Sequence, residues 1–293
     1  MSHVLEKITT ENTERSRVFF FNNDIKHLKQ LTQNDCGPAC LKMAINFIHR
    51  NCPHALRNER VSNIDHLLRH LNLDSKSLWT IDIAHLCAME KINHVMYTIT
   101  LGVLDSYSSV DFYSNETNFR SEMLRIEQKF SKAKEIGINV IKDSIDLDRI
   151  KYELNRNNVC IVLVDANLLN GKNIHLEDED KDLNEVYNSE DMKDFHRVSR
   201  ASCCINPFGK KTDKNSKTDL NKMVEMNIKK SSRSSYCGHY ITLVGYDDVK
   251  ELIFYRNPSS VQNFSFTSYL NFEIARKSFG TDQDILFIYQ SFI

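Results

Sequence analysis

The sequence predicts one α+β domain in which a helix near the N-terminus packs on a mainly antiparallel sheet. Three stretches support this fold class. Residues 36–48 carry apolar side chains at helical spacing, residues 239–255 have the pattern of a β-hairpin, and residues 159–164 form a continuous apolar run typical of a strand buried on both faces. With 293 residues, 41% of them hydrophobic, the chain can bury the core of one large domain spanning residues 1–293.

The predicted helix at residues 36–48 places a cysteine where a loop becomes a helix. Its apolar positions recur at i, i+3, i+4 and i+7 and are Leu41, Ala44, Ile45 and Ile48. Asp35 precedes the helix as a candidate cap, and Pro38 falls in the first turn, where its missing N–H costs nothing. A thiol at a helix N-terminus feels the positive end of the macrodipole, which lowers its pKa. Cys36 is therefore the candidate nucleophile.

The predicted hairpin supplies a candidate base and a residue to orient it. Its two strands are rich in β-branched and aromatic residues and flank a turn at Asp248. Folding the chain about Asp248 pairs positions whose numbers add to about 496 or 497, which brings Asn257 opposite His239. The amide oxygen of Asn257 can then fix the tautomer of His239, leaving the other ring nitrogen to serve as a base. Asp248 is a poorer candidate for this role because it lies at the far end of the hairpin.

Gln30 completes the candidate site. It precedes Cys36 by six positions, which is close enough for its side-chain N–H to donate to an oxyanion formed when the thiolate attacks a carbonyl. Each residue also has a simpler structural interpretation. Cys36 alone would be a core cysteine, His239 a surface residue at the start of a strand, and Asn257 the first residue of a turn.

The other elements follow from periodicity and turn residues. Alternating or β-branched stretches predict strands at residues 17–21, 94–100, 140–141 and 285–289. Apolar residues at helical spacing predict helices at residues 63–72, 78–88, 116–137, 147–155 and 271–279. Gly137 and Gly280 follow two of these helices at positions where a glycine ends a helix readily.

Two segments fall outside this pattern. Residues 1–23 are predicted to be a short lead-in. Residues 167–235 contain an acidic block and two basic blocks with few apolar residues, which predicts a charged surface insert that is wholly or partly disordered. The insert is a candidate contact surface for a protein partner, although solvated charge is the usual outcome for such runs.

Charge balance, apolar runs and cysteine spacing indicate which partners and which cellular compartment to expect. The 38 Lys and Arg residues balance 39 Asp and Glu residues, so no basic field indicates a nucleic-acid or membrane partner. The N-terminal sequence does not have the pattern of a secretory signal, and no apolar run is long enough for a membrane helix, so the expected location is cytoplasmic, with the nucleus as an alternative. The eight cysteines include no C-x-x-C pair, and no metal site is expected.

The segment QLTQNDCGPACLKM (residues 30–43) resembles the nucleophile motif of papain-like bacteriocin-processing cysteine peptidase domains. A wider resemblance is to the eukaryotic guanylyl cyclase domain-containing family, which is similar to those peptidases. Its further motifs are TITLGV (98–103), FYSNE (112–116), VCIVLVDA (159–166), GHYITLVGYD (238–247), IFYRNP (253–258) and NFEIARKSFGTDQDILFIY (271–289). The resemblance implies a papain-like fold, with Cys36 as nucleophile, His239 as base, Asn257 as its orienter and Gln30 as oxyanion donor.

The expected function is a papain-like cysteine hydrolase, of the peptidase or acyl-transfer type, that acts on a peptide or acyl substrate without a cofactor. The family name implies an alternative, a guanylyl cyclase that makes cyclic GMP from GTP with Mg²⁺ or Mn²⁺. The chain has no G-x-x-x-x-G-K-[ST] phosphate loop, and Asp282 and Asp284 are interpreted as the turn into the last strand. A third alternative is a binding module that kept the cleft and lost turnover.

Overall fold

The computed structural model describes residues 19–51, 64–73, 77–109, 119–169, 172–174, 220–225, 228 and 236–292. The helices whose bounds fall within the described residues include α1 (Cys36–Asn51), α2 (Ile64–His70), α3 (Thr80–Met89), the 3₁₀ helix η2 (Asp105–Ser109), α5 (Phe119–Lys132), α6 (Leu147–Asn155), α7 (Ala166–Leu169) and α11 (Tyr269–Lys277). The strands are β1 (Phe19–Phe21), β2 (Ile92–Thr98), β3 (Val140–Lys142), β4 (Val159–Asp165), β5 (Lys172–Ile174), β6 (Gly238–Asp247), β7 (Leu252–Arg256), β8 (Phe264–Ser268) and β9 (Ile285–Phe292). Most of the predicted lead-in and most of the predicted insert lie outside the described residues.

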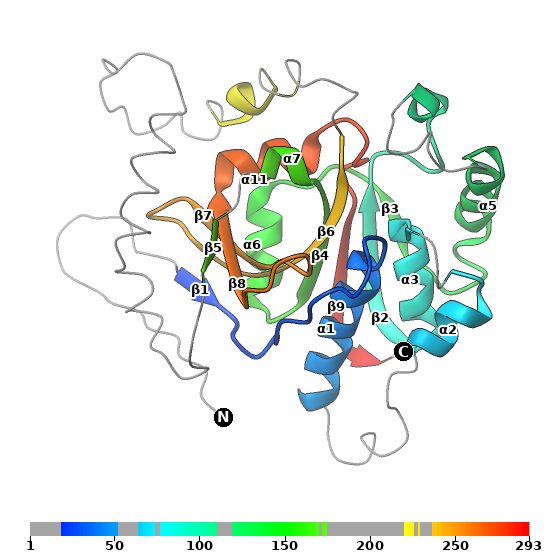
Figure 1. The fold of residues 1–293 in the computed structure, drawn as a ribbon, viewed down its shortest axis with the longest axis horizontal. Coiled ribbons are helices and arrows are strands. Elements are labelled where there is room, and N and C mark those ends of the chain that lie inside the picture. Colours follow the sequence, from blue (N-terminus) through cyan, green and yellow to red (C-terminus); the bar gives the residue numbers. More distant parts are fainter. Residues whose placement is uncertain are drawn as a thin grey trace.

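The strands form one sheet in the order β3-β2-β9-β4-β6-β7-β8-β5, and β1 pairs with the end of β6 (Figure 1). Neighbouring strands are antiparallel except β2 and β3, which are parallel. Every residue of the central strand β4 is buried, as its continuous apolar run predicts. The predicted α+β fold with a mainly antiparallel sheet is confirmed.

Helices cover both faces of the sheet. Alternate side chains of β4 point to opposite sides, so Ile161 joins a core with α1 and α3, whereas Val162 joins a core with α6 and α11. Figure 1 shows α2, α3 and α5 grouped on one side of the sheet, and α6, α7 and α11 on the other. This arrangement places the N-terminus of α1 against β6, the strand that carries His239.

The predicted hairpin is present as β6 and β7, but its register differs from the expected one. Thr242 pairs with Arg256, so the strands are shifted by about two residues relative to the predicted pairing. The ladder is irregular beside Gly245, where the β1 backbone approaches so closely that no Cβ atom would fit. Asn257 therefore reaches His239 from the turn after β7 and not from a position in the ladder.

Two further differences concern strands and helix ends. β8 was not predicted, and it extends the sheet beyond the hairpin by pairing with both β7 and β5. The helix predicted at residues 116–137 ends at Lys132, because the chain turns there before Gly137, whose φ of 79° leads the backbone into β3. Residues 172–174, inside the predicted insert, belong to the sheet as β5.

Candidate functional site at the start of α1

Cys36 is the first residue of α1, as the sequence predicts. Asp35 precedes it, but its side chain does not cap the helix in the expected direction. The two carboxylate oxygens of Asp35 accept hydrogen bonds from the backbone N–H groups of Leu31 and Thr32, each at 2.9 Å, and so close the loop before the helix. Its backbone carbonyl accepts the first helical hydrogen bond from Ala39, also at 2.9 Å.

The thiol of Cys36 lies against β6. The backbone N–H groups of Tyr240 and Gly37 lie close enough to its sulfur to lower the pKa of the thiol. Gly37 allows this close approach, because a Cβ atom there would lie 3.0 Å from the side chain of Ile83 and 3.3 Å from that of Tyr240. The sulfur thus lies beside the residue that directly follows His239 in the chain.

The electrostatic environment of Cys36 corrects one expectation from the sequence. Burial raises the pKa of the Cys36 thiol, and the charge of Asp35 raises it further, while the surrounding N–H groups lower it. The net direction is opposite to the lowering expected at a helix N-terminus, because desolvation of the thiolate outweighs the stabilisation from the helix end. The resting sulfur is therefore a neutral thiol near pH 7.

His239 and Asn257 are in direct contact. Nε2 of His239 lies 2.9 Å from Oδ1 of Asn257. The same Oδ1 accepts the backbone N–H of Ser259 at 3.0 Å and its hydroxyl at 2.7 Å. A backbone N–H can only donate, so this amide atom is the oxygen and Nε2 must carry the proton. The neutral ring then presents its lone pair on Nδ1, the nitrogen that a general base would use.

The protonation of His239 follows from its surroundings. Burial lowers the pKa of its imidazole, whereas the hydrogen bond to Asn257 raises it. Desolvation is the larger effect, so the ring is neutral at pH 7. The resting state of the candidate site therefore consists of a neutral thiol at Cys36 and a neutral imidazole at His239.

Gln30 lies beside the turn that carries Asn257. Its backbone N–H donates to the carbonyl of Pro258 at 2.8 Å. Its side-chain nitrogen donates to the carbonyl of Thr32 at 2.7 Å, so one of the two amide hydrogens is already used within its own loop. The amide oxygen is buried without a hydrogen-bond partner. The role of Gln30 as oxyanion donor, which would use the second hydrogen of this amide, stays a prediction.

Sequence reasoning missed two residues that hold this arrangement together. Arg256 is 2% exposed and donates to the carbonyls of Ile25, at 2.8 Å, and Asn263. Burial lowers the pKa of Arg256 to about 10, and no carboxylate among the residues that the structure describes is paired with it. His27 donates through Nε2 to the backbone carbonyl of Asn257 at 2.9 Å. The position of Arg256 directly before Asn257 in the IFYRNP motif could have drawn attention to it. The sequence around His27 contains no motif or spacing that links it to Asn257.

A buried carboxyl pair lies behind Tyr240. The Tyr240 hydroxyl contacts Thr80 at 3.0 Å, and Thr80 also hydrogen-bonds the Asp284 side chain. Burial and the neighbouring Asp282 raise the pKa of Asp284 to about 8. The turn expected at these aspartates is present, with positive φ at Asp282, but their burial was not foreseen.

Three further features were sought among the described residues: metal-binding groups, other cysteines and membrane-spanning helices. Within the described ranges, no group of three or more His, Cys, Asp or Glu side chains could hold a metal ion. Of the cysteines described there, Cys40, Cys87 and Cys160 are fully buried and Cys237 is exposed. No helix in this part of the chain has both the length and the apolar character needed to cross a membrane.

Two comparisons with known proteins point to the same family. The model of a family described as guanylylate cyclase matches residues 25–288 of this chain. Guanylyl cyclase 1 of Arabidopsis thaliana is 27% identical to the chain over 266 residues, which is 90% of this chain and 75% of the plant protein. The match with the family model includes all four residues of the candidate site.

Proposed function

For a chain that belongs to the guanylylate cyclase family, we propose a cysteine hydrolase of the peptidase or acyl-transfer type, built on a papain-like arrangement of Cys36, His239, Asn257 and Gln30. The observation that carries the proposal is the hydrogen bond from His239 to Asn257, which leaves Nδ1 as the basic nitrogen of a ring adjacent in the chain to the residue that contacts the thiol. The substrate is a peptide or another acyl compound.

The proposed reaction proceeds in two halves. Nδ1 of His239 takes the thiol proton as the Cys36 sulfur bonds to the carbonyl carbon, and the carbonyl electrons move to its oxygen. The remaining amide N–H of Gln30 and the backbone N–H of Cys36 stabilise this oxyanion. When the oxyanion collapses, the bond to the leaving group breaks and His239 protonates that group. Water, deprotonated by His239, then attacks the thioester, and the thiol is regenerated with the acid product.

Labelling with an electrophile that carries a carbonyl, such as a chloromethyl ketone, tests this proposal. We expect Cys36 to react faster than the exposed Cys237, measured site by site by mass spectrometry. Substitution His239→Ala removes the base and should slow the reaction at Cys36 by about a hundredfold or more, whereas His66→Ala, at an exposed helical position, should not. Equal labelling of Cys36 and Cys237, or a rate that is the same in His239→Ala, would exclude the hydrolase.

A second candidate is a guanylyl cyclase, favoured by the family and by the name of the plant relative. Metal ions for that reaction would need carboxylates that leave room for bound water and GTP phosphates. Asp282 and Asp284 do not fit this need, because they are 8% and 6% exposed and Asp282 accepts the Tyr107 hydroxyl at 2.6 Å. Incubation with GTP and Mg²⁺ or Mn²⁺ tests for cyclic GMP, and a cyclase should keep its turnover in Cys36→Ala.

A further inference from the structure

Tyr240 follows the candidate base His239 in β6 and is buried where β6 meets α1 and α3. Only 4% of its surface is exposed. Its ring packs on the first turn of α1, because a Cβ atom at Gly37 would lie 3.3 Å from it. Its backbone N–H lies close enough to the Cys36 sulfur to lower the pKa of that thiol. The position of Tyr240 therefore affects both the strand that carries the base and the helix end that carries the thiol.

The hydroxyl of Tyr240 joins this strand to the start of α3. It donates to the backbone carbonyl of Leu78 at 3.2 Å and lies 3.0 Å from Oγ1 of Thr80. A carbonyl can only accept, so the Tyr240 proton is used at Leu78 and Thr80 is the donor in the second contact. Because Thr80 has one hydroxyl proton, this contact depends on where that proton is directed.

Asp284 is a second acceptor near the Thr80 hydroxyl. Burial and the neighbouring Asp282 raise the pKa of Asp284 to about 8, while the hydroxyls of Thr80 and Thr98 lower it. The Thr98 hydroxyl donates to the carbonyl of Thr100 at 3.1 Å, so its proton is already used. Oδ1 of Asp284 is buried without a hydrogen-bond partner. Of the two threonines, Thr80 is therefore the one that can donate to an ionised Asp284.

The charge of Asp284 sets the direction of this chain of hydroxyl groups. A protonated carboxyl can donate its own proton, which leaves the Thr80 proton for Tyr240. An ionised carboxylate is the stronger acceptor and draws the Thr80 proton toward itself, so that Tyr240 loses Thr80 as a donor. Among the described residues, the ionisable side chains around Asp284 are Asp282, on the same turn, and Tyr107 of η2, which donates to Asp282 at 2.6 Å.

We propose that Tyr240 is a positioning residue of the thiol site and that Asp284, in its acid form, holds it there through Thr80. Tyr240 then keeps its backbone N–H at the sulfur and fixes the start of β6, which carries His239. Ionisation of Asp284 takes Thr80 away from Tyr240, and the reaction at Cys36 slows. The inference rests on the proposed function, because it concerns the reactivity of Cys36 with His239 as its base.

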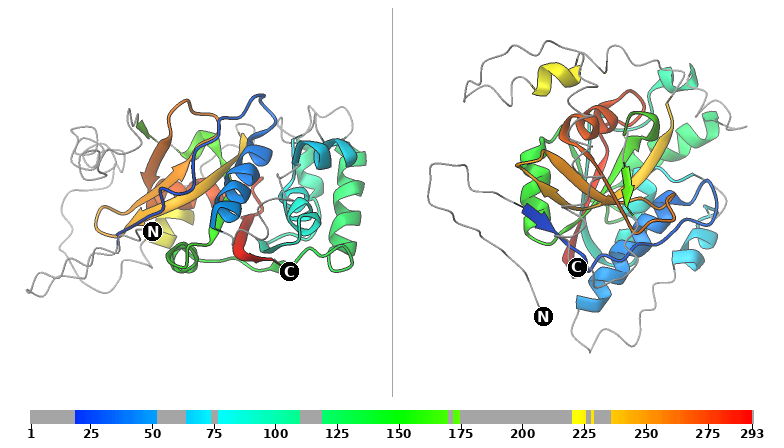
Figure 2. Two further views of the ribbon diagram at one scale, coloured as in Figure 1. Left: turned by 90° about the horizontal axis from the view of Figure 1, so that it is seen from below. Right: turned by 60° about the vertical axis from the view of Figure 1, so that its left-hand side comes forward.

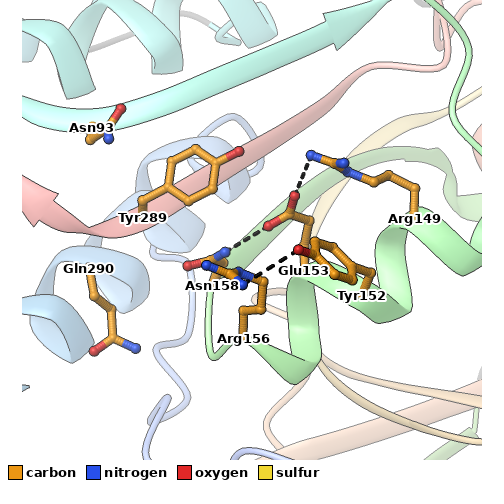
Figure 3. Close-up of a pocket in the computed structure, with 8 residues that line it drawn as sticks. All are labelled: Asn93, Arg149, Tyr152, Glu153, Arg156, Asn158, Tyr289 and Gln290. Carbon is orange, nitrogen blue, oxygen red and sulfur yellow. Dashed lines mark hydrogen bonds and ion pairs between the residues drawn. The ribbon is translucent and has the colours of Figure 1, made fainter.

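Labelling of Cys36 in the full chain with a chloromethyl ketone, measured by mass spectrometry, tests the proposal. Tyr240→Phe and Thr80→Val each remove a hydroxyl with little change of shape, so each should slow labelling about tenfold at pH 7. The double variant should also be slower by about tenfold and not a hundredfold, because both substitutions break the same contact. Tyr152→Phe is the matched control and should label at the wild-type rate. Figure 3 shows Tyr152 on α6, where its hydroxyl lies 3.4 Å from Nη1 of Arg156.

The pH dependence of labelling separates positioning from a general loss of stability. The side chain of Asp284→Asn does not ionise, and its amide can donate to Thr80 at every pH. Between pH 7 and 9.5 the rate at Cys36 in the wild type should therefore fall about tenfold relative to the rate in Asp284→Asn. Ionisation of the thiol itself changes both rates alike and cancels in this ratio. With Thr80→Val present in both chains, the ratio should not change with pH.

Three results would overturn the inference. They are a wild-type rate in Tyr240→Phe or in Thr80→Val, a double variant slowed by the product of the two single effects, and a ratio of wild type to Asp284→Asn that is constant from pH 7 to 9.5. Thermal melting checks the fold, and if a hydroxyl variant does not fold, the comparison with Asp284→Asn decides. Failure of the proposed function gives a different result, namely a wild-type rate at Cys36 in His239→Ala.

Discussion

Asn257 contacts the imidazole of His239 through a single oxygen atom. That oxygen accepts the imidazole N–H together with two donors from Ser259, so its position does not depend on the histidine. Because an amide is neutral, it selects a tautomer of His239 without stabilising the imidazolium form as a carboxylate would. We therefore expect the residue type at position 257 to set the charge of His239, with an amide leaving the imidazole neutral and a carboxylate favouring the imidazolium form.

Asn257→Asp should replace the neutral contact between His239 and residue 257 with an ion pair between an imidazolium and a carboxylate. All three donors can also bind a carboxylate, so we expect the variant to fold. The added negative charge should raise the pKa of His239, so the ring should stay protonated to a higher pH and the acid limb of the pH profile of Cys36 labelling should move upward by about one pH unit or more. Asn46→Asp, which adds the same charge at an exposed position on α1, is the control. An unchanged profile in Asn257→Asp would show that His239 does not govern the thiol.

At the scale of elements, the segment between β1 and α1 is positioned by the end of β7. Figure 2 shows this segment, in blue, running beside the orange strands before it enters α1. Asn22 donates to the Val244 carbonyl at 2.7 Å, Arg256 binds the carbonyl of Ile25, and Gln30 donates to Pro258. One buried arginine thus links the loop that carries Gln30 to the turn that carries Asn257.

Substitution Arg256→Met should separate these two segments. It removes the donors and leaves the carbonyls of Ile25 and Asn263 buried without partners, so we expect the free energy of unfolding to fall by about 2–5 kcal/mol. Urea denaturation measures this loss, and labelling of Cys36 in the remaining folded protein should slow as Gln30 moves. Arg50→Met is the matched control, since Arg50 binds the Asp24 carbonyl of the same segment from an exposed position. An equal loss of unfolding free energy in Arg256→Met and Arg50→Met would contradict the inference that the burial of Arg256 makes its contacts more important than those of Arg50.

At the scale of the whole molecule, local sequence patterns predicted the helices and strands, whereas tertiary packing determines the pKa values and the long-range contacts of the site. Periodicity was sufficient for α1, β4 and the hairpin, and the predicted contact between His239 and Asn257 forms although the register that predicted it was wrong. The pKa direction of Cys36 was wrong because desolvation depends on how α1 packs against β6, which no spacing encodes. The link through Arg256 was equally hidden, because its partners are backbone carbonyls far away in the sequence.

The buried carboxyl groups of Asp282 and Asp284, behind Tyr240, should make the stability of the fold depend on pH. Asp284 is surrounded by Asp282, Thr80 and Thr98, and Tyr107 donates to Asp282. The pKa of Asp284 rises from its ordinary value of 3.8 to about 8 in the folded chain. Its stabilising contribution is therefore fully present below the unfolded pKa and is lost as the pH rises through the folded pKa, since only the unfolded chain releases the proton in between.

Asp284→Asn should remove this dependence, because an amide resembles the protonated carboxyl and does not titrate. Between pH 4 and 8 the free energy of unfolding of the wild type should decline relative to the variant, by up to about 1.4 kcal/mol per pH unit. Urea denaturation across this range measures both curves, with Asp105→Asn as a control at an exposed carboxyl group. Parallel curves for wild type and Asp284→Asn would mean that Asp284 is ionised in the folded protein. In that case a cation, and not a proton, would have to balance its charge next to Asp282.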